Sequence, residues 1–271
     1  MNEPQLNQPV FIIGCQRSGT TLLNLMLDSH PNVHGVDEMH FNAGHMREYM
    51  FGSAYRPCVC FKLPTATHTV QELKTFPGVK ILWALRDPRQ VVASMLKLSL
   101  HLEDTPIHWI EHPIGGVREI DNCWALLADT DDEALQELVR QRDTYARDPE
   151  RRHTREAHVH SAALCWRLKQ AILPLYESQS IDIRVVRYEN IVERSEDEAA
   201  RILDFLGLPW DDSVLNHHRL HDGQSVGRTD NTRAIDTNSL TLWTQTLSED
   251  DLAIIHGVCN TAANPLGYDL A

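Results

Sequence analysis

The chain has 271 residues, which is enough to bury a sizeable core, and we predict a single domain over residues 1–271. A formal net charge of −13 argues against nucleic acid or an acidic polysaccharide as a general partner. No apolar run approaches the roughly 20 residues that span a bilayer, and the first ten residues do not resemble a signal peptide, so we expect no integral membrane segment. The six cysteines are scattered, and we therefore expect reduced thiols in a cytoplasmic protein.

Short apolar runs alternate with segments of helical periodicity along the chain. We predict buried strands at residues 10–13 and 79–85, a further strand at residues 181–187, and a short buried strand or turn at residues 33–36. We predict helices at residues 20–29, 158–176, 195–206 and from Ser248 onward. Asp87 and Pro88 suit the N-cap and the first position of a helix, and Ser195 with Glu198 has the spacing of a capping box. The alternation predicts an α/β, P-loop-containing fold of three layers, with a central parallel sheet flanked by helices.

Three stretches carry weaker signals. Residues 39–60 lack periodicity, and we predict loop and short helix there, near the acceptor site. Residues 100–156 are rich in charge and predict a helical excursion or lid, either as a plain solvated face or as a substrate-recognition surface. Residues 217–237 are polar and loop-like, and their H-H-x-x-H cluster lacks the glutamate of a metalloprotease motif, so we predict no metal site.

The segment GCQRSGTT, residues 14–21, lies between the first predicted strand and the first predicted helix. Backbone N–H groups at a helix start have no intrahelical partner and can receive an anion. Gly14 and Gly19 have the spacing of G-x-x-x-x-G-K-[ST], but Thr20 stands at the lysine position. The missing lysine argues against magnesium-dependent triphosphate hydrolysis, while Arg17 still offers a forked cation to one phosphate. By pattern alone, an ordinary turn after a buried strand fits equally well.

A second motif, LRDPRQVVASM, covers residues 85–95. Arg86 stands where a strand is predicted to end, and Ser94 follows eight residues later, about two helical turns along and on a similar face. A guanidinium and a hydroxyl so placed could bind a second phosphate. The alternative is a surface arginine and a helix serine without a ligand.

Together, these motifs resemble those of sulfotransferases that use 3′-phosphoadenosine-5′-phosphosulfate (PAPS). RSGTT resembles the 5′-phosphosulfate loop and R-D-P-x-x-x-V-x-S the 3′-phosphate element. VRYENIV with FLGLPW, and LTLWTQTLSEDD with NPLGYDL, resemble the later landmarks, and VDEMHF is closest to the tyrosylprotein sulfotransferase-like and bacterial branch. The resemblance implies PAPS as donor, adenosine 3′,5′-bisphosphate (PAP) as product, an acceptor hydroxyl or, less favoured, an amine, and no required metal.

The resemblance also implies roles for individual residues. Glu38 corresponds to a general base, Lys62 to the lysine that steadies the bridging oxygen, and Arg17 adds positive charge. The implied nucleotide-binding residues are Arg17, Ser18, Gly19, Thr20, Thr21, Arg86, Ser94, Tyr188 and Arg228. A solvated loop carboxylate and a surface lysine are the alternatives for Glu38 and Lys62. His40 and His45 lie close to Glu38 in the sequence and could assist or replace it.

Two departures from the family pattern bear on the ligands. Many relatives carry a basic residue before the tryptophan of the closing segment, whereas Leu242 precedes Trp243, so Arg228 or Arg233 could supply that contact. The arginines that follow the glutamate in tyrosylprotein sulfotransferases are not reproduced after Glu38. We therefore expect a small-molecule, lipid or sugar acceptor rather than an acidic peptide, and a homodimer is compatible with the sequence. A P-loop kinase-like phosphotransferase and a catalytically inactive nucleotide-binding protein are the rival interpretations.

Overall fold

The computed structural model describes residues 7–52, 56–102, 104–225 and 229–270. The chain divides into two compact units. The first comprises the described residues of Met1–Leu85 and Leu175–Thr237, and the second comprises those of Arg86–Pro174 and Asn238–Ala271. The single domain expected from the sequence stays a prediction.

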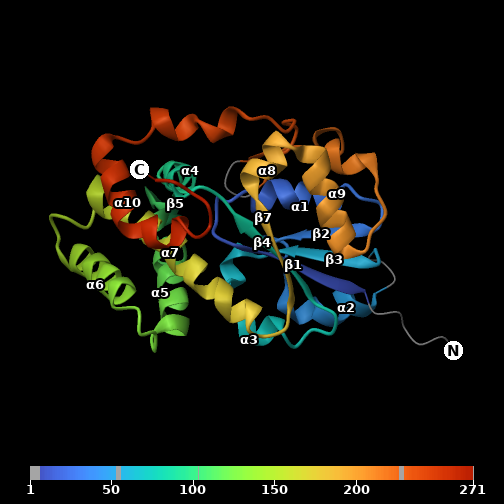
Figure 1. Ribbon diagram of the computed structural model, residues 1–271, viewed down its shortest axis with the longest axis horizontal. Coiled ribbons are helices and arrows are strands. Elements are labelled where there is room, and N and C mark those ends of the chain that lie inside the picture. Colours follow the sequence, from blue (N-terminus) through green and yellow to red (C-terminus); the bar gives the residue numbers. More distant parts are fainter. Residues whose placement is uncertain (1–6, 53–55, 103, 226–228, 271) are drawn as a thin grey trace. The chain divides into compact units, whose positions relative to one another are not determined.

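A five-stranded parallel sheet forms the centre of the first unit (Figure 1). Its strand order is β2-β3-β1-β4-β7, and each neighbouring pair is parallel. The strands are β1 (Gln8–Gly14), β2 (Val33–Asp37), β3 (Cys58–Lys62), β4 (Lys80–Leu85) and β7 (Asp182–Arg187). The predicted α/β class and the strands predicted at residues 10–13, 79–85 and 181–187 are confirmed, and residues 33–36, expected to form a strand or a turn, lie in the strand β2. The strand β3 was not predicted, because it lies at the end of the stretch that we interpreted as loop and short helix.

The first unit also contains short and long helices that cover the sheet. They are α1 (Thr20–Asp28), α2 (Met46–Phe51), α3 (Val70–Leu73), α8 (Tyr188–Glu193) and α9 (Ser195–Leu206), with 3₁₀ turns at Ala43–His45, Pro64–Ala66, Asp212–Leu215 and His217–Arg219. A small antiparallel pair, β8 (Gln224–Ser225) and β9 (Thr229–Asp230), completes the unit. The predicted helix at residues 20–29 is confirmed as α1.

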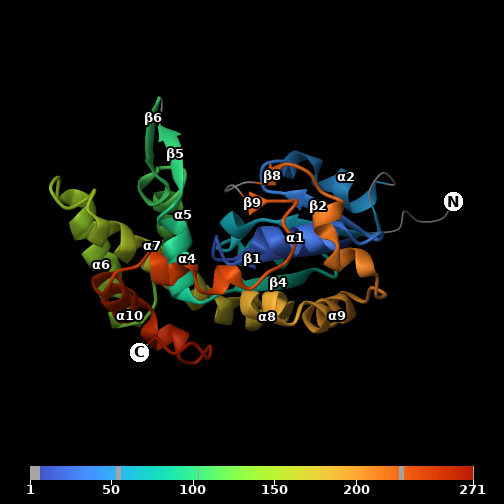
Figure 2. The same ribbon diagram turned by 90° about the horizontal axis from the view of Figure 1, so that it is seen from above.

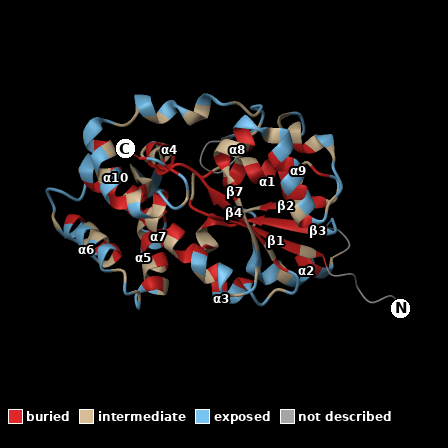
Figure 3. Cartoon of the chain, viewed as in Figure 1, coloured by how far each residue is buried: buried red, intermediate tan, exposed pale blue. Residues whose placement is uncertain are grey.

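Both faces of the sheet are covered, as alternating side chains of β1 demonstrate. Val10 and Ile12 belong to a buried cluster with residues of α1 and α9. Phe11, between them, stacks on its register partner Phe61 with ring centroids 5.0 Å apart, and Tyr49 of α2 meets Phe61 edge-on at 5.3 Å. Figure 3 shows the central strands as largely buried. Helices therefore flank the sheet on both sides.

The predicted capping box at Ser195 is wrong. The N-cap of α9 is Arg194, which makes no side-chain capping bond, and Ser195 is already the first helical residue. Glu198 instead accepts a hydrogen bond from Arg184 of β7 at 3.1 Å, and its side chain is 3% exposed. In a capping box, the Glu198 carboxylate would accept a hydrogen bond from the backbone at the helix start. It instead forms an ion pair with Arg184 of the neighbouring strand.

The second unit is mainly helical. Its helices are α4 (Pro88–Met95), α5 (Gly116–Leu127), α6 (Glu133–Arg147), α7 (Arg155–Glu177, with its end in the first unit) and α10 (Glu249–Ala263), with 3₁₀ turns at Trp109–Glu111, Asn238–Leu240 and Leu242–Gln245. An antiparallel hairpin of β5 (Ser99–Leu102) and β6 (Thr105–His108) extends away from α4 and α5 (Figure 2). Helices α5 and α6 lie in the predicted helical excursion, the hairpin was not foreseen, and a lid role stays a prediction.

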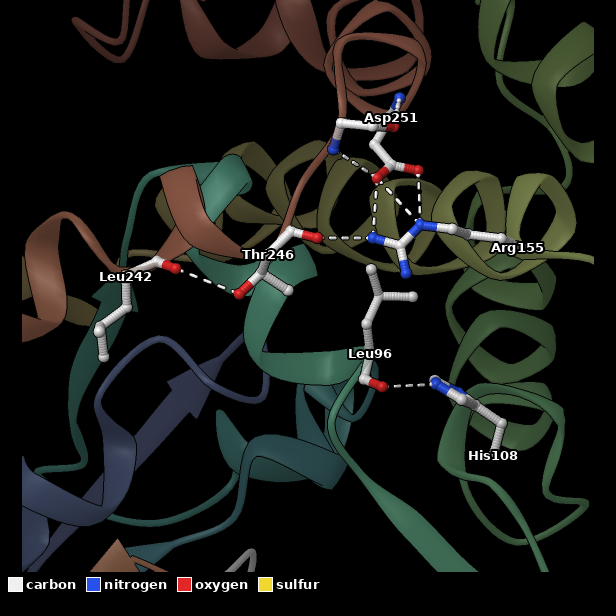
Figure 4. Close-up of polar contacts among 7 residues, drawn as sticks. Leu96, His108, Arg155, Leu242, Thr246 and Asp251 are labelled. Carbon is white, nitrogen blue, oxygen red and sulfur yellow. Dashed lines mark hydrogen bonds and ion pairs between the residues drawn. The ribbon is translucent and has the colours of Figure 1, made fainter.

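Two ionic contacts organise the second unit. Lys169 of α7 and Glu119 of α5 form an ion pair at 2.9 Å, with side chains only 0% and 2% exposed. At the start of α7, Arg155 donates to both carboxylate oxygens of Asp251 and to the carbonyl of Thr246 (Figure 4). Asp251 is also the N3 residue of a capping box, in which Ser248 is the N-cap of α10. The start of α10 is thereby held to the start of α7.

All six cysteines are free and buried: Cys15, Cys58 and Cys60 in the first unit, and Cys123, Cys165 and Cys259 in the second. Burial raises the pKa of the Cys58 and Cys123 thiols to about 12. These thiols are therefore protonated at neutral pH and act as small apolar groups. Within the described part of the chain, no helix is long and apolar enough to cross a membrane.

Candidate functional site

The loop between β1 and α1 is built on left-handed backbone. Gly14, Arg17 and Gly19 have φ angles of 116°, 70° and 86°. Positive φ is easy for glycine and costly for arginine, so the rest of the loop must hold Arg17 in this conformation. A side chain at Gly14 would place Cβ 2.5 Å from the carbonyl oxygen of Ala84, which explains a glycine where β1 ends beside β4.

Thr67 anchors the start of this loop. Its Oγ1 accepts a hydrogen bond from the Gly14 N–H at 3.1 Å and lies 2.9 Å from the Gly14 carbonyl oxygen. Thr67 is 0% exposed, and its own carbonyl accepts a hydrogen bond from Tyr176 at 3.1 Å. The loop therefore leaves β1 from a fixed position. Sequence reasoning missed Thr67 because no local motif marks a hydroxyl that acts 53 residues away.

The middle of the loop has features expected of an anion site. Ser18 is 1% exposed, and its Oγ makes no hydrogen bond to any residue that the structure describes. An unsatisfied buried hydroxyl is costly unless a ligand completes its bonding. Gly19 is the N-cap of α1, so the first N–H groups of this helix, from Thr20 and Thr21, have no intrahelical partner. The residues present here therefore fit a phosphate group.

Tyr188 packs directly against this loop. A Cβ built on Gly19 would lie 2.4 Å from Cδ2 of the Tyr188 ring. Tyr188 is 9% exposed and is the first residue of α8, immediately after β7. The structure thus brings Tyr188 to the predicted phosphate loop, as a packing contact on its glycine.

Glu38 and Lys62 meet at the ends of neighbouring strands. Lys62 is the last residue of β3 and is 1% exposed, and Glu38 follows the last residue of β2. Lys62 Nζ donates a hydrogen bond to Glu38 Oε1 at 3.0 Å. A buried ammonium requires such compensation. The alternative of a surface lysine is therefore excluded, and two of the predicted catalytic side chains are in direct contact.

In the second unit, Arg86 lies just before α4, and Ser94 lies in the last turn of this helix. Arg86 is 9% exposed and donates to Gln90 Oε1 at 2.8 Å and to the Ser239 carbonyl at 3.2 Å. Ser94 lies on α4 and is half-buried. Asp87 accepts a hydrogen bond from the Arg89 N–H as N-cap, with Pro88 in the first turn, which confirms the predicted helix start.

A basic residue does contact the closing tryptophan, although Leu242 precedes it. The Arg89 guanidinium lies 4.8 Å from the centre of the Trp243 ring and also forks onto the carboxylate of Asp87. Cation–π attraction favours this arrangement. Arg233, one of the residues considered for the missing contact, instead pairs with Asp236. The other, Arg228, lies outside the described residues.

The two histidines near Glu38 take no part in the Glu38–Lys62 contact. His40 and His45 are exposed, and His45 Nδ1 lies 3.9 Å from Glu48 Oε2. Their assistance to Glu38 stays a prediction. The H-H-x-x-H cluster contains His217, which is buried, and burial lowers its pKa to about 4. Among the described residues, no three histidine, cysteine or acidic side chains are grouped in a way that could hold a metal ion.

Known proteins resemble this chain in sequence. A family model described as the sulfotransferase family matches residues 9–52, which include the phosphate loop and Glu38. The chain is 25% identical over 303 residues to protein-tyrosine sulfotransferase A of Caenorhabditis elegans, covering 96% of this chain and 67% of that protein. It is 22% identical over 307 residues to protein-tyrosine sulfotransferase 1 of Danio rerio, covering 96% and 72%.

Solved structures resemble it in fold. The sulfotransferase domain from the curacin biosynthetic pathway superposes with a TM-score of 0.52 and 15% identity, covering 98% of this chain and 100% of that domain. The sulfotransferase domain of the Synechococcus PCC 7002 olefin synthase gives a TM-score of 0.53 and 16% identity, covering 100% and 98%. The fold is therefore shared across the chain.

Proposed function

Because the chain belongs to the sulfotransferase family, we propose that it transfers a sulfuryl group from PAPS to an acceptor hydroxyl and releases PAP. The observation that carries the proposal is the contact of 3.0 Å between Glu38 and the buried ammonium of Lys62. A carboxylate and a cation in contact at the ends of adjacent parallel strands suit a reaction that needs both a base and charge stabilisation.

The nucleotide is proposed to bind through its two phosphate ends. The loop containing Arg17, Ser18 and Gly19, with the first N–H groups of α1, would hold the 5′ end. Arg86 and Ser94 would hold the 3′-phosphate with a guanidinium and a hydroxyl. The missing P-loop lysine, replaced by Thr20, supports a nucleotide with a single 5′-phosphate rather than a triphosphate.

In the proposed reaction, bound PAPS supplies the sulfuryl group and the phosphate leaving group. Glu38 accepts the proton of the acceptor hydroxyl and orients that oxygen for attack. Lys62 and Arg17 supply positive charge where negative charge develops during sulfuryl transfer. These roles require no metal ion in the proposal.

The acceptor is proposed to be a small molecule, lipid or sugar with a hydroxyl. The similar proteins of C. elegans and D. rerio are named for protein tyrosine. In this chain, however, Met39, His40 and Phe41 follow Glu38, so no arginine is there to bind acidic residues of a peptide. The net charge of −13 also disfavours an acidic peptide.

Calorimetric titration with PAP, compared with ATP and Mg²⁺, tests the nucleotide. We expect PAP to bind more tightly, and a preference for ATP would support a kinase-like phosphotransferase instead. Transfer of labelled sulfate from PAPS into extracts of the source organism then tests turnover. Tight PAP binding without transfer would support a catalytically inactive nucleotide-binding protein.

The base is tested by Glu38→Gln. We expect the rate of transfer to fall by about 10²- to 10⁴-fold, the usual contribution of a positioned base, with PAP affinity retained. Glu48→Gln is the matched control, since the Glu48 side chain is 67% exposed. Full activity of Glu38→Gln would assign the base to another group, such as His40.

A further inference from the structure

Lys62 has a second carboxylate partner that the predicted site does not include. Asp37 Oδ2 lies 2.8 Å from Lys62 Nζ, closer than the 3.0 Å of Glu38 Oε1. The ammonium, with its side chain 1% exposed, therefore lies between two carboxylates, whose side chains are 16% and 19% exposed. Both carboxylates compensate one buried charge.

The sheet itself fixes the contact between Asp37 and Lys62. They are register partners in the parallel pairing of β2 with β3, and each is the last residue of its strand. Glu38 lies one residue beyond β2, in a turn. Backbone pairing therefore sets the position of Asp37, whereas the position of Glu38 depends on that turn.

Asp37 also holds the turn. Its Oδ1 accepts a hydrogen bond from the Met39 N–H at 3.1 Å, and its carbonyl accepts one from the His40 N–H at 2.8 Å. An aspartate that bonds the N–H two residues further along closes a local turn around the residue between them, here Glu38. One carboxylate thus reaches Lys62 with one oxygen and orders the backbone of Glu38 with the other.

The two carboxylates have different consequences when a proton arrives. Once Glu38 is protonated, its ionic attraction for Lys62 is lost, and an uncompensated ammonium at this depth is costly. We infer that Asp37 is a positioning residue, which compensates the Lys62 ammonium and holds it in place while Glu38 accepts the proton of the acceptor. This inference rests on the proposed function for its catalytic consequence.

Asp37→Asn tests the inference, because asparagine keeps the size of the side chain and removes its charge. We expect kcat for sulfuryl transfer to fall on the order of a hundredfold, as for a misplaced reacting group, with KM for PAPS unchanged. Asp37→Glu, which restores the charge, should recover part of kcat. Asp28→Asn is the matched control: Asp28 Oδ1 accepts a hydrogen bond from the Gly35 N–H of the same strand at 2.6 Å, and this variant should keep its kcat.

A double-mutant cycle measures the pairing without turnover. The Tm is determined for Asp37→Asn, Lys62→Met and the double variant, and we expect the double variant to lose less than the two single losses combined. Additive losses would overturn the inference, and so would an unchanged kcat in Asp37→Asn. If the wild-type protein transferred no sulfuryl group, the proposed function would fail on its own, whereas coupling in the cycle would still support the positioning of Lys62 by Asp37.

Discussion

Gly19→Ala should disturb the phosphate loop through two separable effects. The φ angle of 86° places this residue in left-handed backbone, and its new methyl group would lie 2.4 Å from the Tyr188 ring. Gly207 offers a matched control, because its φ is 72° and nothing lies within 4 Å of a Cβ built there. Gly207→Ala therefore carries the conformational cost without the clash.

The magnitudes follow from these two observations. Left-handed backbone costs an alanine about 1–2 kcal/mol, and we expect this loss in the free energy of unfolding for Gly207→Ala. Overpacking against a buried ring costs a further 1–3 kcal/mol, roughly. Gly19→Ala should therefore lose about 2–5 kcal/mol in total.

Urea unfolding of Gly19→Ala, Tyr188→Ala and the double variant isolates the contact. Removal of the ring removes the clash, so the double variant should lose less stability than the two single losses combined, by about 1–3 kcal/mol. PAP affinity should fall in Gly19→Ala and stay unchanged in Gly207→Ala. A Gly19→Ala variant as stable as Gly207→Ala, or strict additivity in the cycle, would refute the packing of Tyr188 on the loop.

Three further predictions concern nucleotide selection, a buried ion pair and pH. Arg86→Ala should weaken the binding of PAP by about 10- to 100-fold in calorimetry but weaken its analogue without the 3′-phosphate much less, and equal losses would reject the assigned phosphate contact. Arg140→Ala is the control, because the Arg140 side chain on α6 is 62% exposed. Lys169→Met should lower the free energy of unfolding, measured with urea, by about 3–5 kcal/mol because it leaves Glu119 unpaired. The double variant Lys169→Met with Glu119→Leu should have a stability near that of the wild type, and a single variant as stable as the wild type would contradict the prediction. Burial lowers the pKa of His160 from 6.5 to about 4, so stability that is present above pH 6.5 should be lost as the pH falls towards 4, by up to about 3 kcal/mol. His160→Gln should flatten this pH dependence of the free energy of unfolding, and an unchanged slope in the variant would argue against a role of His160.

The sheet could be predicted from the sequence where an apolar run stands directly before a recognisable motif, as residues 10–13 stand before GCQRSGTT and residues 79–85 before RDP. Residues 10–13 and 79–85 became β1 and β4, the two central partners. The strand β3 was missed because CVCFK lies at the end of a stretch without periodicity. Its identity as a strand is set by pairing with β1 on one side and β2 on the other. Local chemistry does not encode such pairing.

The candidate site divides in the same way. Glu38 and Lys62 were predicted from motif positions, and the structure brings them into contact. Thr67 and Asp37 were not predicted as site residues, because their roles depend on a contact with Gly14 and on strand register. Motifs thus identified the candidate ligand-binding residues, whereas the residues that contact and hold them required the three-dimensional structure.

The distribution of the six buried thiols provides an internal reporter of local opening. Three lie in each compact unit, so a thiol reagent in excess would modify each set only when the surrounding structure opens. Mass spectrometry of the labelled peptides would then give separate opening rates for the sheet and for the helical unit under native conditions. Equal rates at all six sites would indicate one cooperative transition, and two distinct rates would indicate that the units open independently.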